Sequence, residues 1–160
     1  MSDAHAGLLR RGGFYCPTAL LFGMLCLAPA AHATLGEPYA SIAADQSRMS
    51  ASLKVTARAG YEVHEMTLPS GTALREYVTG NGLVFAVTWS GPYLPDLRQT
   101  LGKYFADYSA EAQSKRGGHN HLLLDRSDLV IQSNGHMRSF NGRAYLVASV
   151  PAGVSVDELQ

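Results

Sequence analysis

The stretch YEVHEMTLPSGTALREYVTGNGLVFAVTWS, residues 61–90, decides the fold. It contains three runs that are rich in β-branched and aromatic residues, and the turn sequences PSG and GNG separate them. Such runs between short turn signals are typical of consecutive antiparallel strands. A fourth run, LKVTAR at residues 53–58, precedes them. The sequence therefore predicts an antiparallel β-meander that begins near residue 53.

The turn at residues 69–71 predicts how the first two strands of this stretch pair. Pro69 and Gly71 occupy the positions that a three-residue hairpin loop favours, a type I turn followed by a left-handed glycine. This loop places Glu65 opposite Arg75, whereas a two-residue loop would place Glu65 opposite Glu76 and make two carboxylates repel. The same register pairs His64 with Glu76, Met66 with Leu74, and Val63 with Tyr77.

The next turn predicts which side chains form the core. Asn81-Gly82 suits a two-residue type I′ loop, which would bring Trp89 beside Leu74 and Phe85 beside Val78. One face of the sheet would then carry Met66, Leu74, Val78, Phe85, Val87 and Trp89. We expect this apolar face to be the core face.

The second half of the chain predicts one helix and further strands. Apolar side chains recur at helical spacing within residues 95–113, at Leu97, Leu101, Tyr104, Phe105 and Tyr108. The runs LVIQS (129–133) and HMRSF (136–140) then flank Asn134-Gly135, a strong two-residue hairpin signal. The predicted fold class is therefore α+β, an antiparallel β-meander sheet with one principal helix packed on it.

The N-terminal residues have the order of a secretory signal peptide. Arg10 and Arg11 precede an apolar run over residues 14–30, which ends at the A-x-A peptidase motif Ala31-His32-Ala33. We therefore expect a signal peptide at residues 1–33, cleavage near Ala33, a periplasmic or secreted location, and no membrane span after cleavage. Residues 34–52 are rich in Ala, Ser and Pro and predict an extended or disordered lead-in. Residues 53–160 would form a single α+β domain.

Charge and cysteine content exclude several classes of function. The chain has 13 Lys and Arg residues and 13 Asp and Glu residues, and no run of like charge. This pattern lacks the basic patch expected of a nucleic-acid-binding protein. Both cysteines, Cys16 and Cys26, lie inside the predicted signal peptide. The mature protein would therefore have no cysteine nucleophile and no cysteine-ligated metal.

Three histidines raise the question of a metal site. His119 and His121 are two residues apart, so on a strand they would share a face, and His136 or Asp125 could supply a third ligand. The pattern His-x-His is weakly specific, and Gly117-Gly118 before it indicates a loop. A solvated loop with incidental histidines is the favoured interpretation, and we expect no metal and no cofactor.

A second candidate for chemistry is a charged group on neighbouring strands. Glu65, Arg75, Glu76 and His64 could form an acid–base group, although cross-strand charge pairing explains them more simply. Two functions therefore stay open. One is a non-catalytic binding or accessory module, and the alternative is a small hydrolase or metal-dependent enzyme that uses His119/His121/His136 or Glu65/Arg75/Glu76.

The binding hypothesis rests on five candidate residues. His136, Arg138 and Phe140 alternate on one predicted strand and would form a basic–aromatic strip on one face. Arg75 and Trp89 are the other candidate binding residues. The expected partner is another envelope protein or an envelope polymer, with no role for nucleic acid.

Three segments resemble a known family. They are LPSGTALREYV (68–78), GLVFAVTWSGPYLPDLRQTLGKYF (82–105), and DLVIQSNGHMRSFNGRAYL (128–146) with PAGVSVDELQ (151–160). Together they resemble the domain-of-unknown-function 2844 family (DUF2844), secreted proteins of proteobacteria. The resemblance implies export and a single domain. It implies no activity, ligand or catalytic residue.

Overall fold

The computed structural model describes residues 35–114 and 121–160. The predicted signal peptide, its cleavage site and His119 lie outside the described residues. The helices are α1 (Ile42–Met49), α2 (Leu97–Leu101) and α3 (Phe105–Ser114), with short 3₁₀ turns η1 (Tyr39–Ser41), η2 (Gly102–Tyr104), η3 (Val147–Ser149) and η4 (Val156–Glu158). The strands are β1 (Ser52–Arg58), β2 (Tyr61–Thr67), β3 (Ala73–Thr79), β4 (Val84–Gly91), β5 (His121–Asp125), β6 (Leu129–His136) and β7 (Ser139–Leu146).

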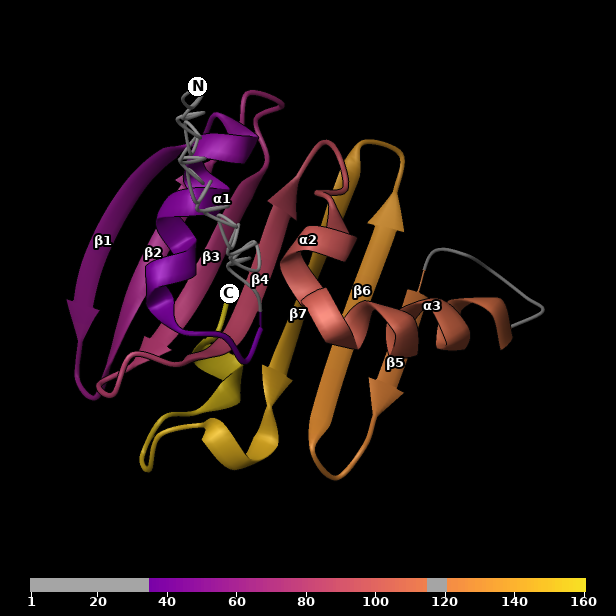
Figure 1. The fold of residues 1–160 in the computed structure, drawn as a ribbon. Coiled ribbons are helices and arrows are strands. Elements are labelled where there is room, and N and C mark those ends of the chain that lie inside the picture. The colour runs from indigo at the N-terminus through magenta and orange to yellow at the C-terminus, as the bar shows by residue number, and fades with distance from the viewer. Residues whose placement is uncertain (1–34, 115–120) are drawn as a thin grey trace, which may run out of the picture.

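The strands form one seven-stranded sheet in the order β1-β2-β3-β4-β7-β6-β5, and every neighbouring pair is antiparallel. The first four strands follow one another as a meander (Figure 1). The helices α2 and α3 then carry the chain to the opposite edge, and β7 returns to pair with β4. This arrangement confirms the α+β class and the antiparallel sheet with a helix packed on it.

The pairing of β2 with β3 confirms the predicted register. Glu65 lies opposite Arg75, and His64 opposite Glu76. The Leu68 carbonyl accepts a hydrogen bond from the amide of Gly71, which has the left-handed φ of 83°. Glycine adopts this φ without a steric penalty, so the loop chemistry alone was sufficient to set the register.

The next turn contains one residue more than predicted, and this changes the face of Phe85. Thr79 and Leu83 bond across the turn, so Gly80, Asn81 and Gly82 form a three-residue loop with Gly82 at a φ of 82°. A β-bulge near Val78 restores the register, and Leu74 lies opposite Trp89 as predicted. The placement of Phe85 on the core face was wrong, because the bulge turns it to the other side of the sheet. There it packs with Tyr61 and Tyr77.

The predicted hairpin at Asn134-Gly135 was also wrong. Strand β6 continues through both residues to His136, and the chain turns at Met137 and Arg138, which has a φ of 65°. Two aromatic rings explain why glycines stand inside these strands. Phe140 covers Gly135, and the indole of Trp89 covers Gly142 so closely that a Cβ there would lie 2.3 Å from Cζ2. Glycine inside a strand often marks such a close approach.

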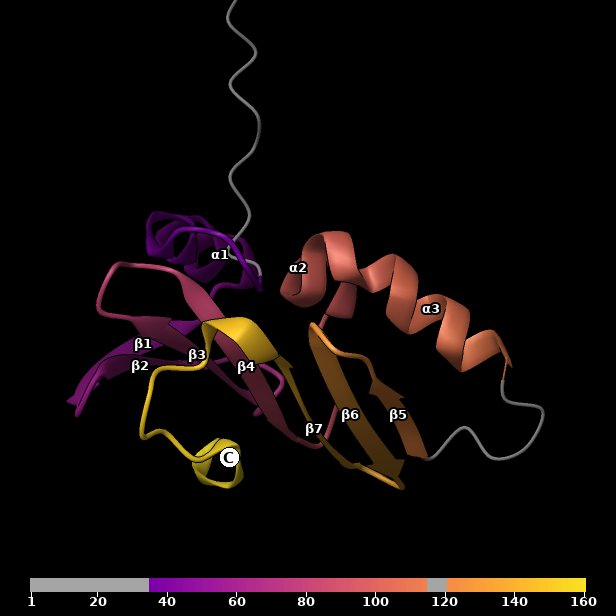
Figure 2. The same ribbon diagram turned by 90° about the horizontal axis from the view of Figure 1, so that it is seen from below.

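All three helices lie on one face of the sheet (Figure 2). Leu35, Ile42, Leu97 and Leu101 bury their side chains against apolar residues of the strands. The segment from Leu35 to Met49 therefore differs from the expected extended or disordered lead-in, because it forms α1 and its Leu35, Ile42 and Met49 pack in the core on the sheet. The predicted helix at residues 95–113 is divided at Gly102, whose φ of 52° interrupts α2 before η2 and α3. None of the described helices is long and apolar enough to cross a membrane.

The opposite face of the sheet is covered over only part of its area. The chain after β7 passes beneath this face and ends there (Figure 2). Its Leu159 is buried against Tyr77, Phe85 and Ala86. None of the helices within residues 35–114 and 121–160 lies over the rest of this face, and this part, which we call uncovered, holds the candidate functional site.

Candidate functional site

A row of polar side chains crosses the sheet on the face away from the helices. The strand registers place one residue of each strand in line, because side chains opposite one another in a sheet share a face. We call this set the polar row. In the order of the strands across the sheet, from β1 to β6, its members are Lys54, Glu65, Arg75, Thr88, Arg143 and Gln132. The apolar Leu123 on β5 lies at the end of the same line.

A shallow concavity of about 550 Å³ lies over the middle of the polar row. Its floor spans β3, β4, β7 and β6, and the C-terminal residues of the chain form one wall. The described polar side chains that line it are Arg75, Thr88, Ser90, Gln132, Asn134, Asn141, Arg143 and Gln160. The two arginines donate hydrogen bonds, the hydroxyl and amide groups both donate and accept them, and none of these side chains is a carboxylate or a histidine.

Two arginines of the concavity are held in fixed orientations. Arg75 donates from Nε to Glu65 (2.5 Å) and from Nη1 to a main-chain oxygen of Gln160 (2.9 Å). Arg143 donates from Nε to the side-chain oxygen of Gln132 (2.7 Å) and from Nη1 to the Val156 carbonyl (2.7 Å). The C-terminal segment therefore orients both guanidinium groups.

Thr88 lies between these two arginines in the polar row. Thr88 is 3% exposed, and its hydroxyl has no hydrogen-bond partner within the described part of the chain. A buried hydroxyl without a partner costs about 1 to 3 kcal/mol of stability. An energetically unfavourable group therefore lies in the middle of the polar row, under the concavity.

The comparison with family models matches the chain over nearly its whole length. The family described as "Protein of unknown function (DUF2844)" matches residues 31–159. This chain belongs to the DUF2844 family. No curated protein matches the chain, and no solved structure does. The match confirms the resemblance seen in the sequence, and it assigns no activity, so the function of this DUF2844 chain must be argued from its site.

Two of the predicted binding residues belong to the concavity of this DUF2844 chain. Arg75 lies on its floor, and Trp89 borders it, although the indole packs in the helix-side core. The other three do not form the predicted strip on one strand. His136 ends β6, Arg138 lies in the turn, and Phe140 is on β7.

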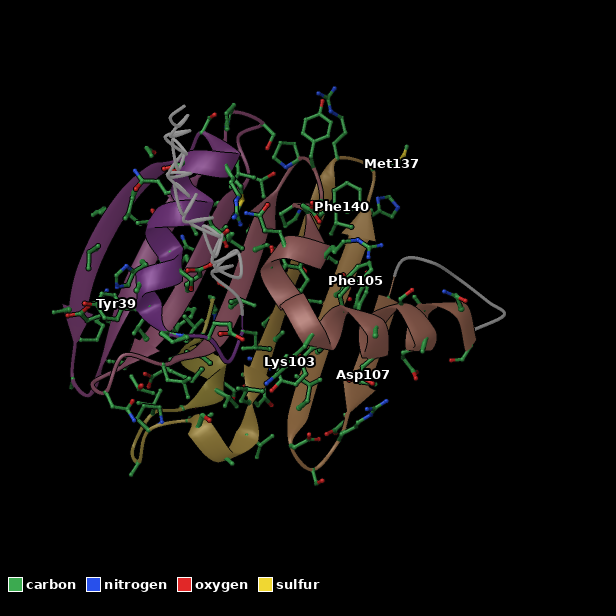
Figure 3. All side chains as sticks on the ribbon, in the orientation of Figure 1. Tyr39, Lys103, Phe105, Asp107, Met137 and Phe140 are labelled. Carbon is green, nitrogen blue, oxygen red and sulfur yellow. The ribbon has the colours of Figure 1, made fainter. Side chains whose placement is uncertain are left out.

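These three residues instead belong to the tip region of the β6–β7 hairpin. Figure 3 shows Met137 at the tip and Phe140 lower on the same hairpin. Met137 is 82% exposed. Arg138 stacks over Tyr93 at 5.9 Å from the ring centroid. This cation–π contact joins the hairpin to the loop after β4.

The proposed acid–base group is not assembled. Glu65 and Arg75 form an ion pair on the face away from the helices, whereas Glu76 points to the helix side, where it is 0% exposed. Neighbouring residues of a strand point to opposite faces, so Arg75 and Glu76 could not act together. Of the three histidines, His121 bonds through Nδ1 to Asn134. No group of three or more potential metal ligands occurs among residues 35–114 and 121–160.

Buried Glu76 forms a second unusual polar group. It lies between His64 on β2 and Val87 on β4, and neither carboxyl oxygen has a hydrogen-bond partner among the described residues. Burial, and then the carboxylate of Asp45 on α1, raise the pKa of Glu76 to about 8. The side chain is therefore protonated and uncharged at neutral pH.

Sequence reasoning missed most of the concavity. Thr88 with Ser90, Gln132 with Asn134, and Asn141 with Arg143 are each two residues apart on a strand. This alternation is the signal that could have indicated a polar face. The pairing of β4 with β7, which brings the three pairs together, is distant in sequence and has no local signal.

Proposed function

We propose that this protein is an exported, non-catalytic binding protein of the cell envelope, located in the periplasm or secreted. It binds an extended polar ligand across the concavity on the uncovered face of the sheet. The observation that carries this proposal is the concavity of about 550 Å³ over the polar row, whose floor spans four strands. A shallow, wide floor of this kind fits a chain of repeating units better than a small molecule, which usually binds in an enclosed pocket.

The chemistry of the lining supports binding in preference to catalysis. General acid–base catalysis most often uses histidine or a carboxylate. Apart from Trp89 and Leu159, the described side chains of the concavity carry guanidinium, amide and hydroxyl groups, which recognise polar ligands through hydrogen bonds. Export is supported by the order of charged, apolar and A-x-A segments over residues 1–33. The ligand would then be an envelope polymer or an envelope protein.

The proposal is tested with the full chain expressed in a Gram-negative host. We expect the protein in the periplasm or the medium, with Thr34 as its first residue. We further expect it to co-sediment with purified envelope material, either peptidoglycan sacculi or outer-membrane vesicles. Ser90 is exposed on the floor of the concavity, so Ser90→Trp fills the floor with an indole and should reduce co-sedimentation at least tenfold.

The matched control is Ser114→Trp, which places the same indole at the exposed end of α3, away from the concavity. It should bind like the unaltered protein. Equal loss of binding in both variants, or unchanged binding in Ser90→Trp, would reject the concavity as the binding surface. Retention of an uncleaved chain in the cytoplasm would reject export.

A further inference from the structure

We infer that the concavity recognises a ligand oxyanion, a carboxylate or phosphate group of an acidic polysaccharide, between Arg75 and Arg143 and above Thr88. This inference rests on the proposed binding function and adds the chemical class of the ligand. It depends on the free donors of the two arginines, on their charge, and on the unpartnered hydroxyl between them.

The two guanidinium groups keep donors for a ligand. A guanidinium has five N–H donors in a fixed plane. The hydrogen bonds described for Arg75 and Arg143 use two donors on each. Because those bonds fix the orientation of both groups, a ligand would lose little side-chain entropy when it binds.

The charge available to a ligand is greater at Arg143 than at Arg75. Arg75 shares its charge with Glu65 at 2.5 Å. The carboxylate nearest Arg143 is Asp157 at 3.6 Å, and its side chain is 86% exposed. An exposed ion pair of this length contributes little because water screens it. Arg143 is therefore the main anion ligand, and Arg75 adds hydrogen bonds from the other side.

Thr88 completes this subsite from below. Strands lie about 4.8 Å apart, so Arg75 and Arg143 are separated by about 10 Å at the backbone, with Thr88 midway. Because Arg75 bonds through Nε to Glu65 on β2 and Arg143 bonds through Nε to Gln132 on β6, these edges face away from Thr88, and the ligand oxyanion would contact the remaining Nη donors. The Thr88 hydroxyl is buried and has no partner among the described residues, and a rotation about χ1 would bring it to the concavity, where an oxygen of the ligand accepts its hydrogen.

The rest of the lining suits a sugar polymer. Ser90 and Asn141 lie opposite each other, in the row next to the polar row, and Asn134 follows on β6. Hydroxyl and amide groups both donate and accept, as sugar hydroxyls require. A ligand with an acidic group over Thr88 would place its neighbouring sugar units over this row.

Thr88→Val tests the subsite without damage to the fold. Valine has nearly the same shape as threonine, and the change removes a buried hydroxyl that has no partner. We expect the melting temperature to stay equal or rise, and the affinity for an acidic polysaccharide to fall at least tenfold. Thr72→Val is the matched control, because the buried Thr72 hydroxyl donates to the Tyr93 carbonyl at 2.8 Å outside the concavity. It should lower the melting temperature and leave the affinity unchanged.

The probes are polygalacturonate, phosphorylated dextran and unmodified dextran, titrated calorimetrically into the full-length exported protein. Binding of either acidic polymer, with no binding of dextran and a loss in Thr88→Val, would support the inference, and the stronger acidic polymer identifies carboxylate or phosphate. Equal binding of dextran and phosphorylated dextran would overturn the inference while leaving the proposed function intact. Unchanged affinity in Thr88→Val, or no binding of any of the three polymers, would also overturn it. The proposed function falls only if co-sedimentation with envelope material fails as well.

Discussion

Glu76→Gln is expected to remove a large loss of stability that the unaltered protein suffers as the pH rises. The folded pKa of Glu76 is raised from 4.5 to about 8, first by burial and then by Asp45. At a pH between these two pKa values, Glu76 of the folded protein binds one proton that the unfolded chain has released. The stability contributed by this proton is fully present below about pH 4.5 and is lost as the pH rises through about 8.

The expected size follows from the width of this pH window. The folding equilibrium changes about tenfold per pH unit, so the free energy of unfolding falls by about 5 kcal/mol in total. The neutral amide that replaces the carboxyl group cannot ionise, so the variant should match the unaltered protein near pH 5 and exceed it most above pH 8. The groups that face Glu76 are Asp45 from α1 and His64 from β2, and both are kept in the variant.

Urea denaturation at intervals from pH 4.5 to 9 measures this effect. Glu158→Gln, which changes an exposed glutamate near the C-terminal end of the chain, is the control and should give a curve parallel to that of the unaltered protein. A Glu76→Gln curve that is also parallel would show that Glu76 does not carry a proton in the folded state at neutral pH.

Gly142→Ala is expected to destabilise the fold by about 3 kcal/mol or more. A Cβ at this position would lie 2.3 Å from Cζ2 of Trp89 and 2.5 Å from the Gln132 carbonyl oxygen. Trp89 is buried at the centre of the sheet, and the carbonyl belongs to the neighbouring strand, so neither can move aside at small cost. Chemical denaturation at a fixed pH gives the difference in the free energy of unfolding.

Gly135→Ala in the same hairpin is the matched comparison. Its Cβ would lie 2.8 Å from Cδ1 of Phe140, another aromatic ring over a glycine. Phe140 is only partly buried near the end of the hairpin and can turn toward solvent, so the cost should be about 1 kcal/mol or less. Equal costs for the two substitutions would contradict the role given to the indole of Trp89 in the register of β7.

The parts of the fold that local chemistry determines were predictable. Pro69 and Gly71 specify a loop of defined length, and the register of β2 with β3 follows from it. The parts that depend on distant contacts were not. Asn134-Gly135 is a strong turn signal, but Phe140 covers Gly135 and the chain turns three residues later than expected. Nothing near Asn134 in sequence indicates that ring.

The candidate site was predicted in part for the same reason. Arg75 was named from its pairing with Glu65, a local hairpin contact. Arg143 and Thr88 were missed because β4 meets β7 only after the helices and two further strands. Strand alternation alone places the neighbours Arg75 and Glu76 on opposite faces of the sheet. The acid–base group that contains both could therefore have been excluded from the sequence.

The most direct test of the binding surface is amide-resolved NMR of the ¹⁵N-labelled exported protein, recorded with and without the soluble polymer released from the envelope fraction that it binds. We predict that the amide shifts will concentrate at Thr88, Ser90, Asn134, Asn141 and Arg143, and that the amides of α1 and α3 will stay unchanged. Shifts confined to the helices, or to Tyr93, Met137 and Arg138 at the hairpin tip, would contradict the assignment of the uncovered sheet face as the binding surface.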